Sequence, residues 1–367
     1  MDRLRLTALL GLTLLVACEA EPPPPPPAPP APPAPAAPVK SPEEQKAEAL
    51  QGKAKGMFQP LPAFMDKGGV RATDDQIALG RALYYETRLS KSQEISCNSC
   101  HDLAAFGVDN KPTSPGHKGQ LGGRNSPTSL NAALHIAQFW DGRAADVEAQ
   151  AKGPVLNPGE MAMKDEASVV AVLKSIPGYE EPFKKAFPDQ PDPITYDNMA
   201  NAIGAFERGL VTPSPFDKFL GGDTKALNAE QLAGLEAFID TGCIACHSGV
   251  GVGGAGYFKL GQAVPYETKD MGRFEVTKVE TDKMVFKAPS LRNATKTAPY
   301  FHDGSIATLD QAVTLMAKHQ LGKDIDAATA GKIVTFLGAL EGTVDAAYVA
   351  KPELPPSGPK TPKADKG

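Results

Sequence analysis

Apolar residues recur at helical spacing in both halves of the chain. One such segment follows Thr73 and another follows Asn228, and both residues are favourable helix N-caps. Each half then closes on apolar residues at i, i+3 and i+7: Ile203, Phe206 and Leu210 in the first half, and Ile333, Phe336 and Leu340 in the second. This spacing predicts helices that pack through one apolar face, and therefore an all-α fold.

Blocks of sequence between these predicted helices occur twice, in the same order. Asn131 and Asn293 each precede a phenylalanine by eight residues. That phenylalanine opens the matching blocks Phe139-Trp140-Asp141-Gly142 and Phe301-His302-Asp303-Gly304. Repeats of this kind indicate duplicated domains. We predict two of them, at 55–212 and 213–345.

Proline is unevenly distributed in this chain of 367 residues. Twelve of the 35 prolines lie between Pro22 and Pro38, and five lie between Pro352 and Pro362. Segments of this composition do not build a core, so we predict a disordered linker at 18–54 and a disordered tail at 346–367. The net charge of −5 and the 22% of charged residues argue against a protein that binds nucleic acid.

The first residues have the pattern of an export signal. Two arginines precede an apolar run that ends at Val16 and is too short to span a bilayer as a helix. The run leads into Leu15-Val16-Ala17-Cys18, which resembles the lipobox of bacterial lipoproteins. We predict a signal peptide at 1–17 and a lipid on Cys18; a signal peptide cut elsewhere, leaving a free thiol, is the alternative. Glu19 at the next position favours the periplasmic side of the outer membrane over the inner membrane.

The other four cysteines form two Cys-x-x-Cys-His motifs, Cys97-Asn98-Ser99-Cys100-His101 and Cys243-Ile244-Ala245-Cys246-His247. This pattern is the attachment signature of c-type haem, in which two thiols reach two vinyl groups and the histidine becomes the proximal iron ligand. A redox dithiol or half a zinc site would explain one copy alone. A four-cysteine zinc ribbon would need the two pairs much closer together. Two copies in an exported chain therefore predict two covalently bound haem c groups.

The two halves differ where a sixth iron ligand is expected. In the second half Met316 shares a predicted helical face with Leu309 and Val313. Methionine and histidine together give a haem of raised potential, which suits an electron-accepting centre. His319 is the competing ligand, because it lies three residues further along. The position in the first half that matches Met316 is Pro154, which cannot ligate iron, so the first haem is five-coordinate or takes a ligand from elsewhere.

His117 is the candidate for that other ligand, because it stands in a glycine-rich loop that little packing would hold in place. His135, in an apolar stretch, is the less favoured candidate. An open iron suits peroxide chemistry, in which a proton must move from the inner to the outer oxygen. Glu160, six residues after Pro154, can carry that proton, and Gln150 can position the peroxide. The alternative is that both are ordinary solvated side chains.

The chain resembles the bacterial di-haem cytochrome c peroxidases over nearly all of residues 55–345. The blocks that carry this resemblance are Val108-Asp109-Asn110, Thr113-Ser114-Pro115-Gly116-His117, Gln138-Phe139-Trp140-Asp141-Gly142-Arg143-Ala144, Gln150-Ala151-Lys152-Gly153-Pro154, Ala205-Phe206-Glu207-Arg208 and Ala298-Pro299-Tyr300-Phe301-His302. The resemblance implies two cytochrome c-like domains with haems of unequal function. The N-terminal haem would be peroxidatic, with His101 as proximal and His117 as displaceable ligand. The C-terminal haem would have high potential, with His247 and Met316 as ligands.

The resemblance also implies how the site works. Glu160 and Gln150 would act on the peroxide, Trp140 would lie between the haems on the electron route, and His302 would contact the cofactor. One electron on the C-terminal haem would release the His117 loop and open the peroxidatic iron. Many relatives have Gly-His-Gly-Trp at this loop where the present chain has Gly116-His117-Lys118-Gly119, so an iron that is open at rest stays an alternative.

A calcium ion, an electron donor and a dimer belong to the same resemblance. Calcium would bind between the domains through the Asn125 side chain and the Thr297 and Pro299 carbonyl oxygens, which are ligands of the type this ion prefers. The substrate would be hydrogen peroxide, and the donor a small periplasmic cytochrome c or a copper protein (cupredoxin). A homodimer is the implied assembly.

Two other functions fit parts of the sequence. A MauG-like di-haem oxidase acts on a protein substrate with the same two haems, but it has a tyrosine ligand where this chain has Met316. A non-catalytic di-haem electron carrier would have both irons six-coordinate. Pro154 opposite Met316, together with Glu160, argues against such a carrier. The predicted function is therefore that of a cytochrome c peroxidase.

Overall fold

Both predicted N-caps start a helix in the computed structural model, which describes residues 23–24 and 40–366. Thr73 caps α2 (Asp74–Tyr84) and Asn228 caps α9 (Ala229–Thr241), each in a capping box with a glutamine at the third helical position. Helix α9 ends at Gly242, whose φ of 99° is a conformation that glycine accepts without strain. Local sequence therefore sets the start of both helices and the end of α9.

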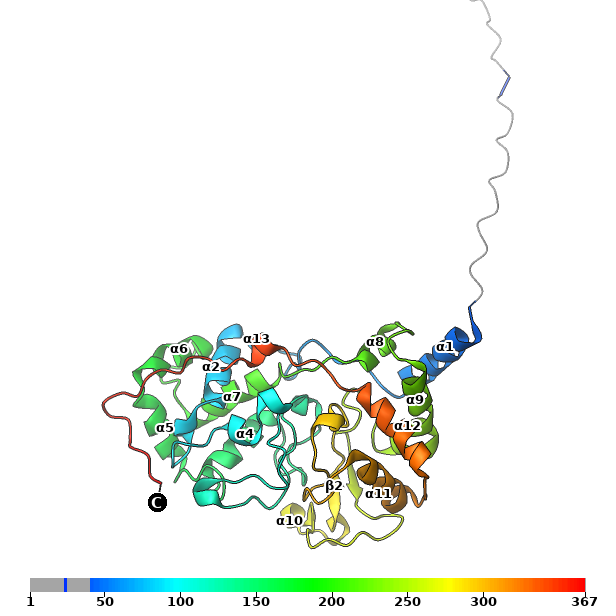
Figure 1. Cartoon of the computed structure of the whole chain (residues 1–367). Helices are drawn as coiled ribbons and strands as arrows, with labels where there is room; N and C mark the ends of the chain where they lie inside the picture. The colour runs from blue at the N-terminus through cyan, green and yellow to red at the C-terminus, as the bar shows by residue number, and fades with distance from the viewer. Residues whose placement is uncertain (1–22, 25–39, 367) are drawn as a thin grey trace, which may run out of the picture. The chain divides into compact units, whose positions relative to one another are not determined.

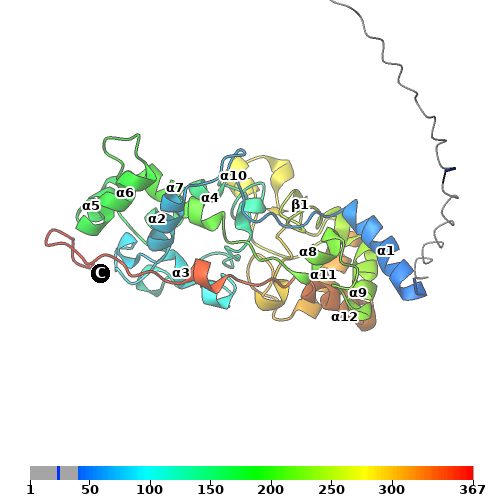
Figure 2. The same cartoon turned by 90° about the horizontal axis from the view of Figure 1, so that it is seen from above.

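Helices dominate the remaining structure, and one small sheet is added to them. Besides α2 and α9, the described residues form α1 (Pro42–Lys55), α3 (Cys97–Cys100), α4 (Val147–Leu156), α5 (Glu166–Lys174), α6 (Glu180–Ala186), α7 (Tyr196–Glu207), α8 (Pro215–Gly221), α10 (Phe274–Thr277), α11 (Leu309–Leu321), α12 (Ala327–Gly338), α13 (Ala346–Val349), β1 (Tyr257–Lys259) and β2 (Val285–Lys287). The strands β1 and β2 pair antiparallel, with Phe258 opposite Phe286. Within the compact unit Ser41–Gly367, α2 and α7 lie in one half, with α5 and α6 further out, and α9 and α12 lie in the other half (Figures 1 and 2).

The two halves have the same helix crossing. Helix α2 packs on α7, and α9 packs on α12. A Cβ on Gly80 would lie 1.8 Å from the carbonyl oxygen of Ala202, and a Cβ on Gly234 would lie 2.2 Å from that of Lys332. Only glycine allows helices to approach this closely, so the same residue type stands at both crossings. Each crossing is at the centre of its own apolar core, and these two cores confirm the predicted all-α fold with two domains.

The repeated asparagines also lie where the two halves of the protein meet. Asn131 and Asn293 both adopt a left-handed φ of 60°. Both donate a hydrogen bond from Nδ2 to Oγ1 of Thr212, at 2.8 and 2.9 Å. Their backbone N–H groups bind the carbonyl oxygens of Leu210 and Leu340 respectively. A single buried hydroxyl at the predicted domain boundary therefore receives the same side chain from each half.

The predicted linker at 18–54 is wrong over its last part, because residues 42–55 form α1. Ser41 caps this helix in a capping box with Glu44. Leu50 and Ala54 are buried in the core of the C-terminal half. The proline-rich composition ends before this helix, and averaging over the whole segment hid the helix start signal.

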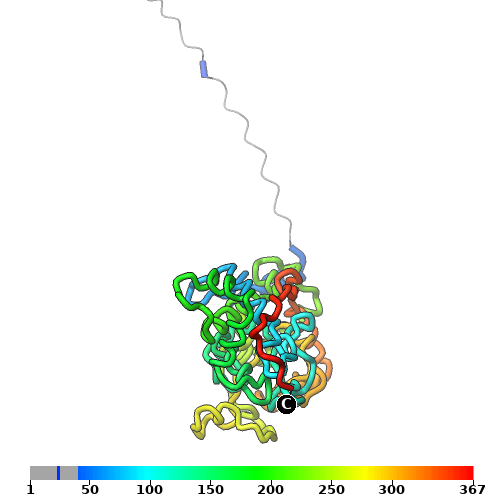
Figure 3. Tube along the Cα trace, turned by 90° about the vertical axis from the view of Figure 1, so that its left-hand side faces the viewer, coloured from blue at the N-terminus to red at the C-terminus, as the bar shows by residue number. Residues whose placement is uncertain are grey.

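The predicted disorder of the tail at 346–367 is also wrong for its described residues. The ring of Tyr348 stacks on Phe206 with centroids 5.2 Å apart, and its hydroxyl donates to the Phe206 carbonyl oxygen at 2.7 Å. Further along, the carbonyl oxygen of Pro355 accepts from Nη2 of Arg88 at 2.8 Å. Figures 1 and 3 show this red segment crossing the N-terminal half. Proline prevents regular structure, but it does not prevent an extended chain from packing.

The predicted signal peptide and the lipid site at Cys18 fall in residues 1–22, outside the described part of the chain, and stay predictions. Most of the proline-rich segment, residues 25–39, lies outside it as well. Among the described residues, no helix combines the length and the apolar character that crossing a bilayer requires.

Candidate active site

The first Cys-x-x-Cys-His motif opens onto a cavity of about 1080 Å³, lined mainly by the N-terminal half and closed on one side by residues of the C-terminal half such as Asp270 and His302. Cys97 and Cys100 lie at the two ends of α3, and the N–H of His101 donates to the Cys97 carbonyl oxygen at 3.0 Å. This single helical turn brings both thiols and the imidazole to the same cavity. Gln150 and Glu160, the two residues predicted to act on peroxide, line it as well.

The second motif lines a separate cavity of about 250 Å³ in the C-terminal half. The N–H of His247 donates to the Cys243 carbonyl oxygen at 3.0 Å, as in the first motif. Met316, on α11, lines this cavity together with His247 and Cys246. The competing residue His319 is not among the described residues that line the second cavity. Its Nδ1 lies 2.9 Å from the Val264 carbonyl oxygen. This geometry favours Met316 over His319 as sixth ligand.

Both cavities have the chemistry that a c-type haem requires. Burial lowers the pKa of His101 and lowers that of His247 to about 4, against a smaller opposing effect of nearby carbonyl groups. Both imidazoles are therefore neutral, which is the form that binds iron. Burial also raises the pKa of all four thiols, to about 11 for Cys243. Such surroundings favour uncharged sulfur, as in a thioether. The two thiol pairs lie in different cavities, so they do not form one four-cysteine zinc site.

His117, the predicted displaceable ligand, is not among the described residues that line the first cavity. Its imidazole is 5% exposed, and neither ring nitrogen has a hydrogen-bond partner among the described residues. Its backbone N–H donates to the Glu160 carbonyl oxygen at 2.7 Å. A Cβ on Gly116 would lie 1.9 Å from the Gly159 carbonyl oxygen. The His117 loop therefore packs directly against the loop that carries Glu160, and neither can move without affecting the other.

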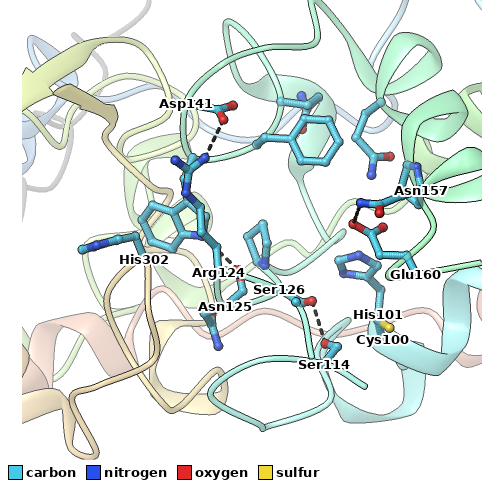
Figure 4. A pocket seen from close by; sticks show the side chains of 18 of the residues that line it. Cys100, His101, Ser114, Arg124, Asn125, Ser126, Asp141, Asn157, Glu160 and His302 are labelled. Carbon is cyan, nitrogen blue, oxygen red and sulfur yellow. Dashed lines mark hydrogen bonds and ion pairs between the residues drawn. The ribbon is translucent and has the colours of Figure 1, made fainter. Parts of the chain in front are cut away.

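Glu160 is held in a defined orientation at the edge of the first cavity. Nδ2 of Asn157 donates to its Oε1 at 2.7 Å, and both side chains lie beside His101 (Figure 4). Burial raises the pKa of this carboxyl, while the Arg143 guanidinium and the Asn157 amide act in the opposite direction. Arg143 is itself placed over the Phe139 ring, 3.5 Å from its centroid. A carboxyl with a raised pKa, oriented into a haem-sized cavity, is suited to proton transfer.

Trp140 and His302 belong to the wall that the two cavities share, since both line each cavity, as do Asn125 and Phe139. Their rings meet edge to face with centroids 6.4 Å apart. Nε1 of Trp140 donates to the Asn125 carbonyl oxygen at 3.0 Å, and the Asn125 N–H donates to the His302 carbonyl oxygen at 2.8 Å. Asn125, Thr297 and Pro299, the predicted calcium ligands, all line the second cavity next to this wall. The calcium ion itself stays a prediction.

Comparison with known proteins identifies the family. The family model for the di-haem cytochrome c peroxidases matches residues 74–225. A cytochrome c551 peroxidase of Pseudomonas aeruginosa is 46% identical over 325 residues, which cover 87% of this chain and 93% of that protein. The chain belongs to the di-haem cytochrome c peroxidase family. A cytochrome c551 peroxidase of Nitrosomonas europaea is 49% identical over 310 residues, 84% of this chain and 90% of that protein. The crystal structure of a MauG-like protein associated with microbial copper homeostasis has a TM-score of 0.68 and 26% identity, over 82% of this chain and 96% of that chain.

As a member of the di-haem cytochrome c peroxidase family, the chain carries two covalently bound haem c groups. The first cavity contains the Cys97 motif and the second contains the Cys243 motif, so each cavity offers one haem attachment site. The predicted fold, the two haem c groups and the enzyme class are confirmed by this membership.

Several residues of the site had no predicted role. Arg143 and Glu207 stand inside blocks that carried the resemblance, so their position in the sequence was a signal, although their function was not. Glu207 lines the first cavity and is 6% exposed. Arg124 and its partner Asp270 gave no signal at all, because they are 146 residues apart in sequence.

Proposed function

We propose that the first cavity is where this di-haem cytochrome c peroxidase reduces hydrogen peroxide to water, and that the electrons enter through the second. The distribution of side chains between the two cavities supports this assignment of roles. Glu160 and Gln150 share the first cavity with His101, whereas Met316 shares the second with His247. The donor is a small cytochrome c or a copper protein. Two electrons and two protons convert one peroxide into two waters.

The bound haems supply an iron that binds and reduces peroxide in the first cavity and a reversible electron store in the second. Glu160 accepts the proton of the inner peroxide oxygen at its carboxylate and returns it to the outer oxygen, which leaves as water. The Asn157 amide keeps the carboxylate turned toward the cavity. The Gln150 amide orients the peroxide by hydrogen bonding. The Arg143 guanidinium, which acts electrostatically on Glu160, opposes its permanent protonation.

The surroundings of the enzyme follow from the same proposal. Export by the signal at 1–17 and a lipid on Cys18 would hold the body on the periplasmic side of the outer membrane, where small electron donors diffuse. Calcium at Asn125, Thr297 and Pro299 would bind against the wall between the cavities, and a homodimer would be the working assembly. Met316 in the second cavity supports the peroxidase over the protein-oxidising alternative, whose members have tyrosine at that position.

Replacing Glu160 tests the proposal. The variant Glu160→Gln keeps the shape and the hydrogen bond from Asn157 but cannot carry a proton. We expect it to lower kcat for peroxide reduction by about 10²- to 10⁴-fold with ferrocytochrome c as donor. Its content of covalent haem, measured as the pyridine haemochrome, should equal that of the wild type. The matched control is Glu181→Gln, which changes an exposed glutamate on α6. Near-normal turnover in Glu160→Gln would contradict the proposed role.

A further inference from the structure

Arg124 joins the two halves of the protein at the wall between the cavities. Its guanidinium is only 15% exposed, and it donates from Nε and Nη2 to the two carboxylate oxygens of Asp270, both at 2.7 Å. Its Nη1 donates to Oδ2 of Asp141 at 2.5 Å. Asp141 belongs to the N-terminal half and Asp270 to the C-terminal half. A bidentate pair on one side and a second carboxylate on the other fix the plane of the guanidinium. We call Arg124, Asp141 and Asp270 the Arg124 clasp.

Each carboxylate of the Arg124 clasp is attached to one side of the shared wall. Asp141 directly follows Trp140 in the chain. Asp270 lies 3.9 Å from Nε2 of His302, and Oγ1 of the nearby Thr268 lies 3.2 Å from the same nitrogen. Figure 4 shows Arg124, Asp141 and His302 together on the side of the cavity opposite Glu160 and His101. The Arg124 clasp therefore lines the first cavity at its contact with the second, on the side away from Glu160. Its Asp141 also accepts from Nη1 of Arg143 at 3.0 Å.

A second contact between the two halves, next to the Arg124 clasp, also holds Asp141. Nη1 of Arg273, from the C-terminal half, donates to the Asp141 carbonyl oxygen at 3.0 Å. The chain at Asp141 is thus held through its side chain by Arg124 and through its backbone by Arg273. Trp140 and His302 meet edge to face and are also linked through the backbone of Asn125, which accepts from Nε1 of Trp140 and donates to the His302 carbonyl oxygen. The Arg124 clasp adds a second link between the two sides of the wall, because it joins the segment after Trp140 to the carboxylate beside His302.

We propose that Arg124 is a positioning residue for electron transfer between the two haem cavities. It sets the relative position of Trp140 and His302 by binding the segment that follows Trp140 and the segment beside His302 at once. The proposal rests on the proposed function, in which an electron from the second cavity completes peroxide reduction in the first. It assigns Arg124 no contact with peroxide and no part in haem attachment.

The test follows a single turnover of the holo-protein with both haems reduced. Hydrogen peroxide is mixed rapidly with the protein, and oxidation of the second haem is recorded from the visible absorption band of its reduced form. Loss of the clasp in Arg124→Gln or Asp270→Asn should slow this oxidation by about 10- to 100-fold, the size expected for a displacement of about 1 Å. The double variant should be no slower than either single variant. Arg124→Lys should be intermediate, because one ammonium group cannot bind both carboxylates in parallel.

Three further measurements separate positioning from a general loss of structure. The reduction potential of the second haem should stay unchanged in every variant. Hydrogen exchange should rise in residues 138–142 and 268–273 of Arg124→Gln. The control Arg71→Gln removes an exposed arginine outside the clasp and should oxidise at the wild-type rate. A wild-type rate in Arg124→Gln and Asp270→Asn would overturn the inference, whatever their melting temperatures. If peroxide does not oxidise the second haem even in the wild type, the proposed function is wrong, and the inference that rests on it is wrong as well.

Discussion

Glu207 offers a quantitative test of the electrostatics around the first cavity. Its side chain is 6% exposed and lines the first cavity. Burial raises its pKa to about 8; the nearby Glu148 carboxylate adds to the rise and Arg208 opposes it. Glu148 is itself paired with Arg208, at 2.7 and 2.9 Å. The arginine is thus largely occupied by a different carboxylate.

The raised pKa makes the folded protein less stable as the pH rises. Below pH 4.5 the carboxyl is protonated in both the folded and the unfolded chain, and it has no net effect. Between pH 4.5 and about 8 the unfolded chain releases the proton and the folded chain keeps it. Each unit in this window costs the folded state about 1.4 kcal/mol, so the cost at pH 7 is about 3 kcal/mol. Glu207→Gln removes this cost, because the amide never ionises.

We therefore expect Glu207→Gln to be more stable than the wild type by about 3 kcal/mol at pH 7, and equal to it near pH 4.5. The measurement is the free energy of unfolding of the holo-protein by guanidinium chloride at several pH values. The comparison variant Glu148→Gln should instead be less stable than the wild type at pH 7, because it leaves the buried Arg208 without its carboxylate partner. Parallel pH profiles for Glu207→Gln and the wild type would refute the reasoning.

Two further predictions concern one residue in each cavity. The first concerns the dependence of kcat/KM on pH. We expect kcat/KM to fall in acid, because a protonated Glu160 cannot accept the peroxide proton. Because the pKa of Glu160 is raised, this fall should begin at a higher pH than for an ordinary glutamate. A fall at the ordinary glutamate pKa would contradict this. Met316→His should lower the reduction potential of the second haem, measured by spectroelectrochemistry, because a thioether ligand favours the reduced iron more than imidazole does. An unchanged potential would point to His319 as the ligand.

The sequence predicted those parts of the molecule that short motifs determine. A Cys-x-x-Cys-His turn brings its own three side chains together, so Cys97 and His101 could be placed in one cavity without a structure. Helix positions followed from caps such as Asn228, and the paired halves followed from repeated blocks. Helix α1 was missed because the proline-rich segment before it dominated the composition, although Ser41 and Glu44 carry a complete capping box.

Contacts between segments that are far apart in the sequence could not be predicted from local motifs. The pairing of Arg124 with Asp270 depends on how the two halves meet, and no local pattern encodes that contact. The position of His117 is a similar case. Its glycine-rich loop suggested mobility, but its packing against the Glu160 loop depends on the close approach of Gly116 to Gly159 in three dimensions.

The most direct test of the central claim is the number of donor molecules that one peroxide consumes. The holo-protein is mixed with an excess of ferrocytochrome c, and measured portions of hydrogen peroxide are added while the oxidation of the donor is followed. The account predicts two ferrocytochromes oxidised for each peroxide, with turnover in the wild type and almost none in Glu160→Gln. No oxidation of the donor by the wild type, or oxidation that proceeds equally well in Glu160→Gln, would contradict it.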